Sequence, residues 1–332
     1  MSREALIADF LDGHGYAAAR AEPLAPDASF RRYLRLRGGP RPAVLMDAPP
    51  PEDIRTFARV ACHLARIGMS PPVIFAVDEA NGLLLEEDLG DDVMSSLLSA
   101  GADPVRLLES AADALVTIQR AVPPHGLPAW DAATMAATAS ATLFDWWWPA
   151  AFGAAAPQAA RRHFAAALEA MLEPVAAGPA CFVHRDFFAG NLLWLRRRRG
   201  LRRIGVLDFQ GAAIGHPAYD LASLLEDARR DIPEWLAERI IARYLAARPE
   251  LDRAAFRAAY AACAAQRHLR VVGQWVRLAR RDGRPGYLVH GPRTWRLLER
   301  AVREPAAAPL AAALDCWIAP HQRGNPPEPV AA

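Results

Sequence analysis

Three polar residues near the middle of the chain have a spacing that suits phosphoryl transfer. Asp186 follows His184 and Arg185, Asn191 lies five positions later, and Asp208 lies seventeen positions after Asn191. Phosphoryl transfer needs an acceptor hydroxyl aligned with the phosphorus atom and divalent cations that neutralise phosphate charge. A carboxylate can hold and deprotonate the hydroxyl, and carboxylate and amide oxygens are ligands that Mg²⁺ prefers. The pattern therefore predicts Asp186 as the catalytic base and Asn191 and Asp208 as metal ligands.

Short apolar runs around these residues predict the elements that must position them. The runs at 181–183, 192–195 and 204–207 predict strands, and the last two would form a hairpin across the basic turn at 196–203. Asp208 would then lie on the returning strand of the hairpin. The arginines of the turn are expected to face solvent, with an anion site as the alternative. His184 is expected to support the loop as a buried donor and acceptor, not to act as an acid or base.

The periodicity of apolar residues changes along the chain. Apolar runs predict strands at 30–36, 43–48, 73–77 and 83–89, and helical spacing predicts a helix at 52–67. Beyond residue 90, helical spacing predicts helices at 104–121, 158–171, 234–247, 253–278 and 294–302. The sequence thus predicts an α+β protein with a small, mostly antiparallel sheet in an N-lobe (1–90) and a mainly helical C-lobe (91–332).

All 39 basic side chains are arginine, because the sequence contains no lysine. Phosphate-binding loops that end in lysine, Schiff-base catalysis and biotinyl or lipoyl carriage are therefore excluded. The 37 acidic residues leave a net charge of +2, which does not favour nucleic acid as a partner. The four cysteines are scattered, and neither a leader peptide nor an apolar run of about 18 residues is evident. We expect a cytoplasmic protein without a membrane anchor or an obligate protein partner.

These features together resemble the aminoglycoside phosphotransferase and choline kinase family, over about residues 24–303. The resemblance implies the bilobal protein-kinase-like fold, ATP as the phosphoryl donor and Mg²⁺ as the cofactor. It also implies the roles given above for Asp186, Asn191 and Asp208. Asp220 would tie the catalytic loop to the next helix. Because Asp220 follows Asp208 so closely, no long peptide-binding segment fits between them, and we expect a small-molecule acceptor.

The resemblance also assigns residues to the nucleotide site. The strand at 83–89 would lead into the hinge, with Leu85 at the gatekeeper position and adenine paired with the backbone of Glu86 and Asp88. Val44 would belong to the same site. Ser29 lies in the turn that would cover the phosphates of ATP.

The lysine that the family carries on its third strand is replaced by Met46, which cannot pair with phosphate. A period of two places Arg32 on the same face as the apolar Leu34. A charge on an apolar face needs a partner. An ATP phosphate is one candidate partner for Arg32, and the carboxylate of Asp47 or Glu52 is the alternative.

Several local strings are most similar to the anomeric kinases that phosphorylate N-acetylmuramate and N-acetylglucosamine on the C1 hydroxyl. This resemblance implies an amino sugar as substrate and a sugar 1-phosphate as product, within peptidoglycan recycling. Aromatic rings stack on sugars, and arginine can hold the lactyl carboxylate of muramate. The candidate sugar-binding residues are Phe187, Gln210, Trp146, Trp147, Arg270 and Gln274. Core packing is the alternative for the aromatic residues, and surface charge is the alternative for the arginine.

Two other functions remain open. An aminoglycoside kinase would need an acidic pocket for its polycationic acceptors, whereas the helical segments after Arg253 are basic. A nucleotide-binding pseudokinase would explain the missing lysine, but it would have no need for the complete set of Asp186, Asn191 and Asp208. We therefore expect an ATP-dependent amino-sugar kinase.

Overall fold

The computed structural model describes residues 2–24, 31–50 and 52–327, and it contains two compact units. The first unit consists of Met1–Ile118 and Ala189–Gly211, and the second consists of Gln119–Phe188 and Ala212–Ala332. Both units are therefore discontinuous in sequence. The lobe boundary that we expect after Gly90 stays a prediction, since the first unit continues to Ile118 and also includes a later segment.

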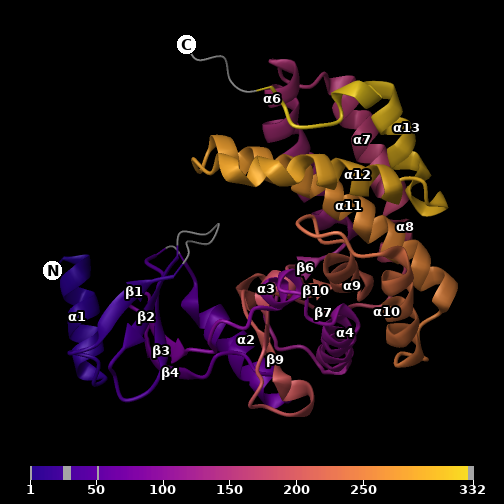
Figure 1. Ribbon diagram of the computed structural model, residues 1–332. Helices are drawn as coiled ribbons and strands as arrows, with labels where there is room; N and C mark the ends of the chain where they lie inside the picture. Colours follow the sequence, from indigo (N-terminus) through magenta and orange to yellow (C-terminus); the bar gives the residue numbers. More distant parts are fainter. Residues whose placement is uncertain (1, 25–30, 51, 328–332) are drawn as a thin grey trace. The chain divides into compact units, whose positions relative to one another are not determined.

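An antiparallel sheet forms the centre of the first unit, with strand order β1-β2-β3-β5-β4 (Figure 1). Its strands are β1 (Arg20–Pro23), β2 (Arg32–Arg37), β3 (Ala43–Asp47), β4 (Ile74–Asp78) and β5 (Leu83–Glu87). The helix α2 (Ile54–Arg66) lies between β3 and β4 in sequence, as predicted, and Asp53 caps its N-terminus. The helix α1 (Arg3–Gly13) and the strand β1 were not predicted.

The two faces of this sheet differ in their environment. Phe10 and Leu11 of α1 join Leu36, Leu45 and Leu85 in a buried apolar cluster. Residues directly opposite each other in an antiparallel pair share a face, so the register places Arg32, which lies opposite Asp47, on this α1 side as well. The other face carries the cross-strand row formed by Arg35, Val44, Glu86 and Ile74.

A short hairpin completes the first unit together with the helices α3 (Met94–Ser99) and α4 (Pro104–Arg120), the last of which reaches the boundary at Ile118. Its strands β8 (Leu192–Trp194) and β9 (Ile204–Val206) pair with Leu192 opposite Val206. The predicted hairpin is therefore confirmed. Asp208, however, follows the returning strand and has the unusual φ angle of 57°. We expected it within the strand, but pairing ends at Val206.

The second unit is mainly helical around a small mixed sheet of β6 (Ala129–Trp130), β10 (Ala213–Gly215) and β7 (Cys181–Val183). The longest helix is α11 (Arg253–Arg280), whose buried residues run from Phe256 to Leu278. Figure 1 shows α12 (Gly291–Ala301) beside it. Further helices of this unit are α7 (Gln158–Met171), α8 (Glu173–Ala176), α9 (Ala218–Leu225), α10 (Glu234–Ala246) and α13 (Ala308–Trp317). All five helices predicted beyond residue 90 are present.

A π-helix interrupts one helical segment of this unit. The helix α5 (Ala132–Thr142) continues into the π-helical turn Leu143–Trp147 and then into α6 (Trp148–Phe152). The helix α11 approaches this segment at Gly273, where an added Cβ atom would lie only 2.1 Å from the carbonyl oxygen of Thr142. A glycine is therefore needed for the backbones to come this close.

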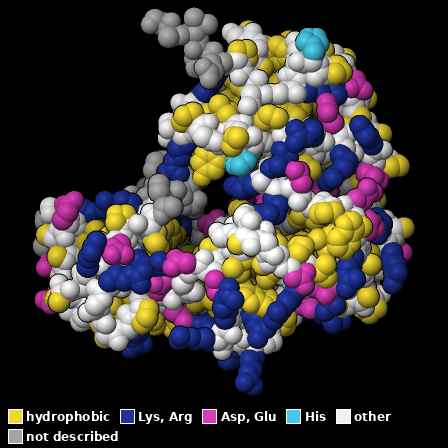
Figure 2. Space-filling view, in the orientation of Figure 1, with side chains coloured by type: hydrophobic (Ala, Val, Ile, Leu, Met, Phe, Trp, Pro, Cys, Tyr) yellow, Lys and Arg dark blue, Asp and Glu magenta, His cyan; other side chains and the backbone are white. Residues whose placement is uncertain are grey.

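Charged side chains of both signs cover the visible surface, and basic side chains gather over the turn of the β8–β9 hairpin (Figure 2). Arg197, Arg199 and Arg202 of this turn are exposed, as expected for a solvated turn. Among the residues described, no helix has both the length and the apolar character needed to span a membrane.

Candidate nucleotide-binding and catalytic residues

The first unit contains a cavity of about 390 Å³ on the face of the sheet opposite α1. Tyr33, Arg35, Val44 and Glu86 line it from the sheet, together with the hinge segment 86–91. Leu193 and Leu207 of the hairpin region also line it. A largely apolar cleft with a few convergent polar groups suits a flat base. Val44, Glu86 and Asp88 thus lie where the sequence predicts nucleotide contacts.

Hydrogen bonds fix the hairpin against the hinge side of this cavity. The N–H of Val206 donates to the carbonyl oxygen of Ser70 at 3.0 Å, and the N–H of Trp194 donates to that of Asp92 at 2.8 Å. These bonds hold Asn191 and Asp208, at the base of the hairpin, on the cavity wall. The Asn191 Nδ2 atom donates to Asp208 Oδ2 at 3.2 Å, so the two predicted metal ligands lie together. Gln210 Nε2 donates to Asp208 Oδ1.

Arg35 shapes the hinge, a role that the sequence interpretation did not assign. Its guanidinium contacts Asp88 Oδ1 at 2.9 Å and Asp91 Oδ1 at 2.7 Å. Asp88 Oδ1 also accepts the N–H of Gly90 at 3.0 Å. The sequence carried a signal for this role. Side chains alternate between the two faces along β2, so Tyr33 and Arg35 lie on the face opposite the α1 side. The Asp88 side chain therefore fixes the hinge, and only its backbone remains a candidate for contact with adenine.

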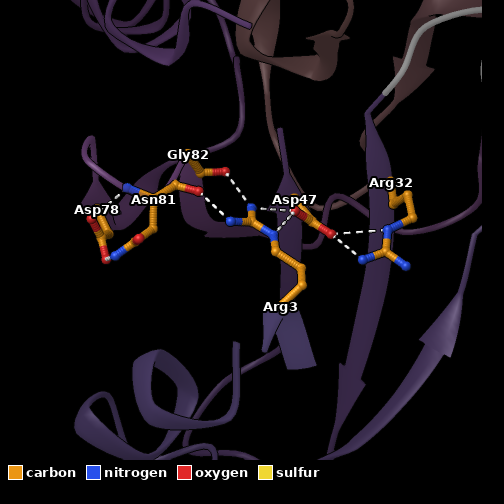
Figure 3. Close-up of polar contacts among 6 residues, drawn as sticks. All are labelled: Arg3, Arg32, Asp47, Asp78, Asn81 and Gly82. Atoms are coloured by element: carbon orange, nitrogen blue, oxygen red, sulfur yellow. Dashed lines mark hydrogen bonds and ion pairs between the residues drawn. The ribbon is translucent and has the colours of Figure 1, made fainter. Parts of the chain in front are cut away.

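Arg32 pairs with a carboxylate, which was the alternative to the phosphate contact. Its Nε atom donates to Asp47 Oδ2 at 2.9 Å, while Arg3 Nε donates to Asp47 Oδ1 at 2.9 Å (Figure 3). Asp47 is almost fully buried between the two guanidinium groups, whereas the Arg32 side chain is 61% exposed. The two arginines thus neutralise a buried charge. A contact of Arg32 with phosphate stays a prediction without support from this arrangement.

Two further predicted nucleotide residues have different outcomes. Leu85 belongs to the apolar cluster under α1, and the face that lines the cavity carries Glu86 in its place. The physical reason is the period of two, because adjacent residues of a strand point to opposite faces. Leu85 is not among the residues that line this cavity, and its gatekeeper position stays a prediction without support from this arrangement. Ser29 lies outside the residues that the structure describes.

The catalytic loop follows β7 in the second unit, and Asp220 of α9 holds its backbone. Asp220 Oδ2 accepts the N–H of His184 at 2.6 Å, and its Oδ1 accepts that of Arg185 at 2.9 Å. His184 is fully buried, and its Nδ1 accepts the N–H of Asp186 at 3.3 Å. The structural roles predicted for Asp220 and His184 are confirmed. Arg185 has a φ of 74° and stacks its guanidinium 4.0 Å from the ring centre of Trp130.

Basic side chains of α11 influence the charge of Asp186. Burial raises the pKa of Asp186, but the charges of Arg270, Arg267, His184 and Arg185 together outweigh burial and leave the pKa below its ordinary value. The carboxylate is therefore ionised at neutral pH. Arg267 is almost fully buried, and its Nε and Nη1 atoms have no hydrogen-bond partner among the residues described. Arg267 was not among the site residues predicted from the sequence.

The aromatic candidates for sugar contact are mostly core residues. Trp147 is buried with its ring centre 5.0 Å from that of Trp295, and its Nε1 donates to the carbonyl oxygen of Gly324. Phe187 is fully buried and meets the His184 ring edge-on. These two rings pack in the core, which was the alternative to contact with a sugar. Trp146, Arg270 and Gln274 are partly buried, so their contact with a sugar stays a prediction.

Comparison with known proteins relates these residues to a family of kinases. The sequence profile of the phosphotransferase enzyme family matches residues 20–257. An N-acetylmuramate/N-acetylglucosamine kinase from Caulobacter vibrioides is 37% identical, covering 95% of this chain and 97% of that protein. A kinase of the same name from Pseudomonas aeruginosa is also 37% identical, covering 87% of this chain and 86% of its own length.

A solved structure with the same architecture supports the fold. The choline/ethanolamine kinase family protein from Mesorhizobium loti superposes with a TM-score of 0.65 and 15% identity, covering 95% of this chain and all of that chain. This likeness confirms the predicted protein-kinase-like α+β fold, with an antiparallel sheet in the N-terminal part and helices in the C-terminal part.

Proposed function

Because the chain belongs to the phosphotransferase enzyme family, whose reaction is phosphoryl transfer to a hydroxyl, we propose that it is an ATP-dependent amino-sugar kinase. It transfers the γ-phosphoryl group to the anomeric C1 hydroxyl of N-acetylmuramate or N-acetylglucosamine, in the cytoplasm, where ATP is available. The observation that carries this proposal is the 37% identity to a kinase of that name along 95% of the chain. The product is a sugar 1-phosphate used in peptidoglycan recycling.

Asp186 is the group that holds the acceptor hydroxyl in this proposal. The loop around it is fixed, because Asp220 accepts both the His184 and the Arg185 N–H groups. Its carboxylate is ionised, so it can accept the hydroxyl proton as the oxygen–phosphorus bond forms. A carboxylate with a lowered pKa is a weak base, which suits a reaction in which positioning contributes more than early deprotonation.

Asn191 and Asp208 would hold Mg²⁺. Their chemistry fits this ion, since a carboxylate and an amide oxygen are hard ligands and the two side chains lie 3.2 Å apart on the wall of the cavity. When bound, Mg²⁺ would neutralise the charge of the phosphates. The two side chains would keep the nucleotide's phosphate end at the hairpin side of the cavity.

Arg270 is the best candidate for recognition of an anionic acceptor. Its charge acts on Asp186, and its Nε atom has no hydrogen-bond partner among the described residues. A partly buried guanidinium favours a carboxylate, and N-acetylmuramate carries one on its lactyl group. An aminoglycoside, as a polycation, would be repelled by Arg270 and Arg267.

Replacement of the proposed base tests the reaction. Asp186→Asn should lower kcat about 10²- to 10⁴-fold, because the amide cannot accept the hydroxyl proton, while ATP binding persists. Phosphate transfer to a panel of small sugars, followed by phosphorus NMR of the product, measures both the acceptor and the position of the phosphate. Asp145→Asn is the control, since Asp145 is an exposed carboxylate of the same unit.

Other outcomes of this experiment would contradict the proposal. Turnover with aminoglycosides but with neither amino sugar would favour an aminoglycoside kinase. ATP binding without turnover of any acceptor would favour a pseudokinase. A phosphate ester at a hydroxyl other than C1 would refute the assigned regiochemistry.

A further inference from the structure

A carboxyl group lies in the largely apolar wall of the nucleotide cavity. Glu86 shares a cross-strand row with Arg35 and Val44, and all three residues line the cavity. Glu86 is only 5% exposed, and its Oε2 atom has no hydrogen-bond partner among the residues described. A buried polar atom without a partner is costly, so its persistence beside a ligand cavity points to a partner on the ligand.

The groups around Glu86 leave its side chain available to a ligand. Arg31 exerts an attractive charge on Glu86, but an Nη2 atom of Arg31 contacts Glu52 Oε2 at 2.6 Å. Tyr33 lines the same cavity, and burial, followed by the nearby Glu86 carboxyl, raises the pKa of Tyr33, so its hydroxyl stays protonated. Burial outweighs the Arg31 charge and raises the pKa of Glu86 to about 8. Near neutral pH the carboxyl is therefore largely protonated, and it offers both a donor and an acceptor.

We propose that the Glu86 side chain recognises the nucleotide base by accepting a hydrogen bond from the 6-amino group of adenine, and so favours adenine over a purine that lacks a polar group at C6. A protonated carboxyl can at the same time donate to a neighbouring ring nitrogen of adenine, which is an acceptor. A purine without the amino group leaves the accepting oxygen buried and unpaired, whereas a 6-oxopurine can still pair with a carboxyl that carries its proton on the other oxygen. The inference rests on one part of the proposed function, namely that the nucleotide binds in this cavity.

Discrimination of this kind follows from general energetics. A site built to hydrogen-bond a ligand group rejects an analogue that lacks the group, because the buried polar atoms of the site are left unpaired. We expect wild-type protein to bind ATP at least about tenfold more tightly than purine riboside triphosphate, which lacks the 6-amino group.

Two substitutions separate recognition from general damage to the site. Glu86→Gln keeps an acceptor and a donor in the same shape and should retain the preference for ATP. Glu86→Leu removes both groups and should bring the two affinities to within about threefold of each other. Glu79→Gln is the control, because Glu79 is an exposed glutamate of the same sheet region that pairs with Arg55.

Calorimetric titration of the full chain with each triphosphate, without sugar, measures these affinities. An unchanged ATP preference in Glu86→Leu would overturn the inference, and so would a wild-type protein that binds purine riboside triphosphate as tightly as ATP. Thermal melting of each variant shows that the protein remains folded. Because no sugar is present, loss of sugar phosphorylation would count against the proposed function without affecting this test.

Discussion

The role of the Arg270 side chain can be tested by comparing two substrates. N-acetylmuramate carries a lactyl carboxylate and N-acetylglucosamine does not, so a guanidinium that binds this group affects only the first sugar. Arg270→Gln should raise the KM for N-acetylmuramate by about 10- to 100-fold, which corresponds to the loss of one charge-assisted hydrogen-bonded pair of about 1.5–3 kcal/mol. The KM for N-acetylglucosamine should change by less than about threefold.

Steady-state kinetics with both sugars measure this ratio. Arg253→Gln is the matched control, since Arg253 is an exposed arginine at the start of the same helix. Equal losses for the two sugars would show that Arg270 acts through Asp186, whose pKa its charge lowers, and not through the lactyl group.

At the residue scale, the sequence proposed candidate site residues but left open which face of the sheet borders the cavity. Asp186, Asn191 and Asp208 were proposed because their spacing is short and their chemistry is specific, and Asn191 and Asp208 do lie together. The alternation along β2 and β3 correctly placed Arg32 with Leu34, but it could not tell which face of the sheet borders the cavity. The helix α1 decides this, because it covers the face that carries Leu85 and leaves Glu86 to the cavity.

At the level of elements, Gly273 allows the backbone of α11 to lie close to the π-helical segment. An added Cβ atom would lie 2.1 Å from the Thr142 carbonyl oxygen, and this neighbour is backbone that cannot rotate away. Gly273→Ala should therefore lower the free energy of unfolding by about 1–3 kcal/mol, as overpacking of a close contact does, despite the better helix propensity of alanine. Chemical denaturation monitored by circular dichroism measures the change.

Gly286→Ala provides the control for this prediction. A Cβ atom at Gly286 meets no other atom within 4 Å, and its φ angle is not in the left-handed region. Its unfolding free energy should change by less than about 0.5 kcal/mol. Equal stability of the two variants and wild type would mean that the two backbones separate at little cost.

The elements that the sequence did not predict have identifiable physical reasons. In α1 only Phe10 and Leu11 are buried, so this helix lacks the long apolar stripe that marks α2. The strand β1 has four residues, two of them charged, and lies at the edge of the sheet. The helix α5 consists largely of alanine and threonine, whose pattern does not distinguish a buried face. Strong periodicity, by contrast, predicted α7 with its observed bounds.

At the scale of the whole molecule, the first unit depends on a segment that lies far away in sequence. Segment 189–211 supplies Phe209, whose ring centre lies 4.6 Å from that of Phe57, and the backbone bond from Val206 to Ser70. Residues 1–118 alone would leave these partners exposed. We expect this fragment to lack a cooperative unfolding transition and to bind no ATP, because hydrophobic burial and one wall of the cavity are missing.

A second chain tests this explanation directly. Joining residues 189–211 to residues 1–118 through a flexible Gly/Ser linker should restore cooperative unfolding and measurable ATP binding, detected by thermal melting and calorimetry. If residues 1–118 melt as cooperatively as the joined chain, the hairpin contributes little to the stability of this unit. Such discontinuity could not be predicted from local patterns, because periodicity carries no information on which distant segments pair.

The β8–β9 hairpin has a consequence for how sequences of this family can diverge. The pairing of Leu192 with Val206 fixes Asn191 and Asp208 at the base of the hairpin, while its arginine-rich turn lies at the opposite end and faces solvent. Insertions and deletions in the turn therefore leave the two proposed metal ligands in register. The number of residues between Asn191 and Asp208 can vary among relatives. The number between Asp186 and Asn191 must be kept, because this segment has no such exposed turn in which an insertion could be accommodated.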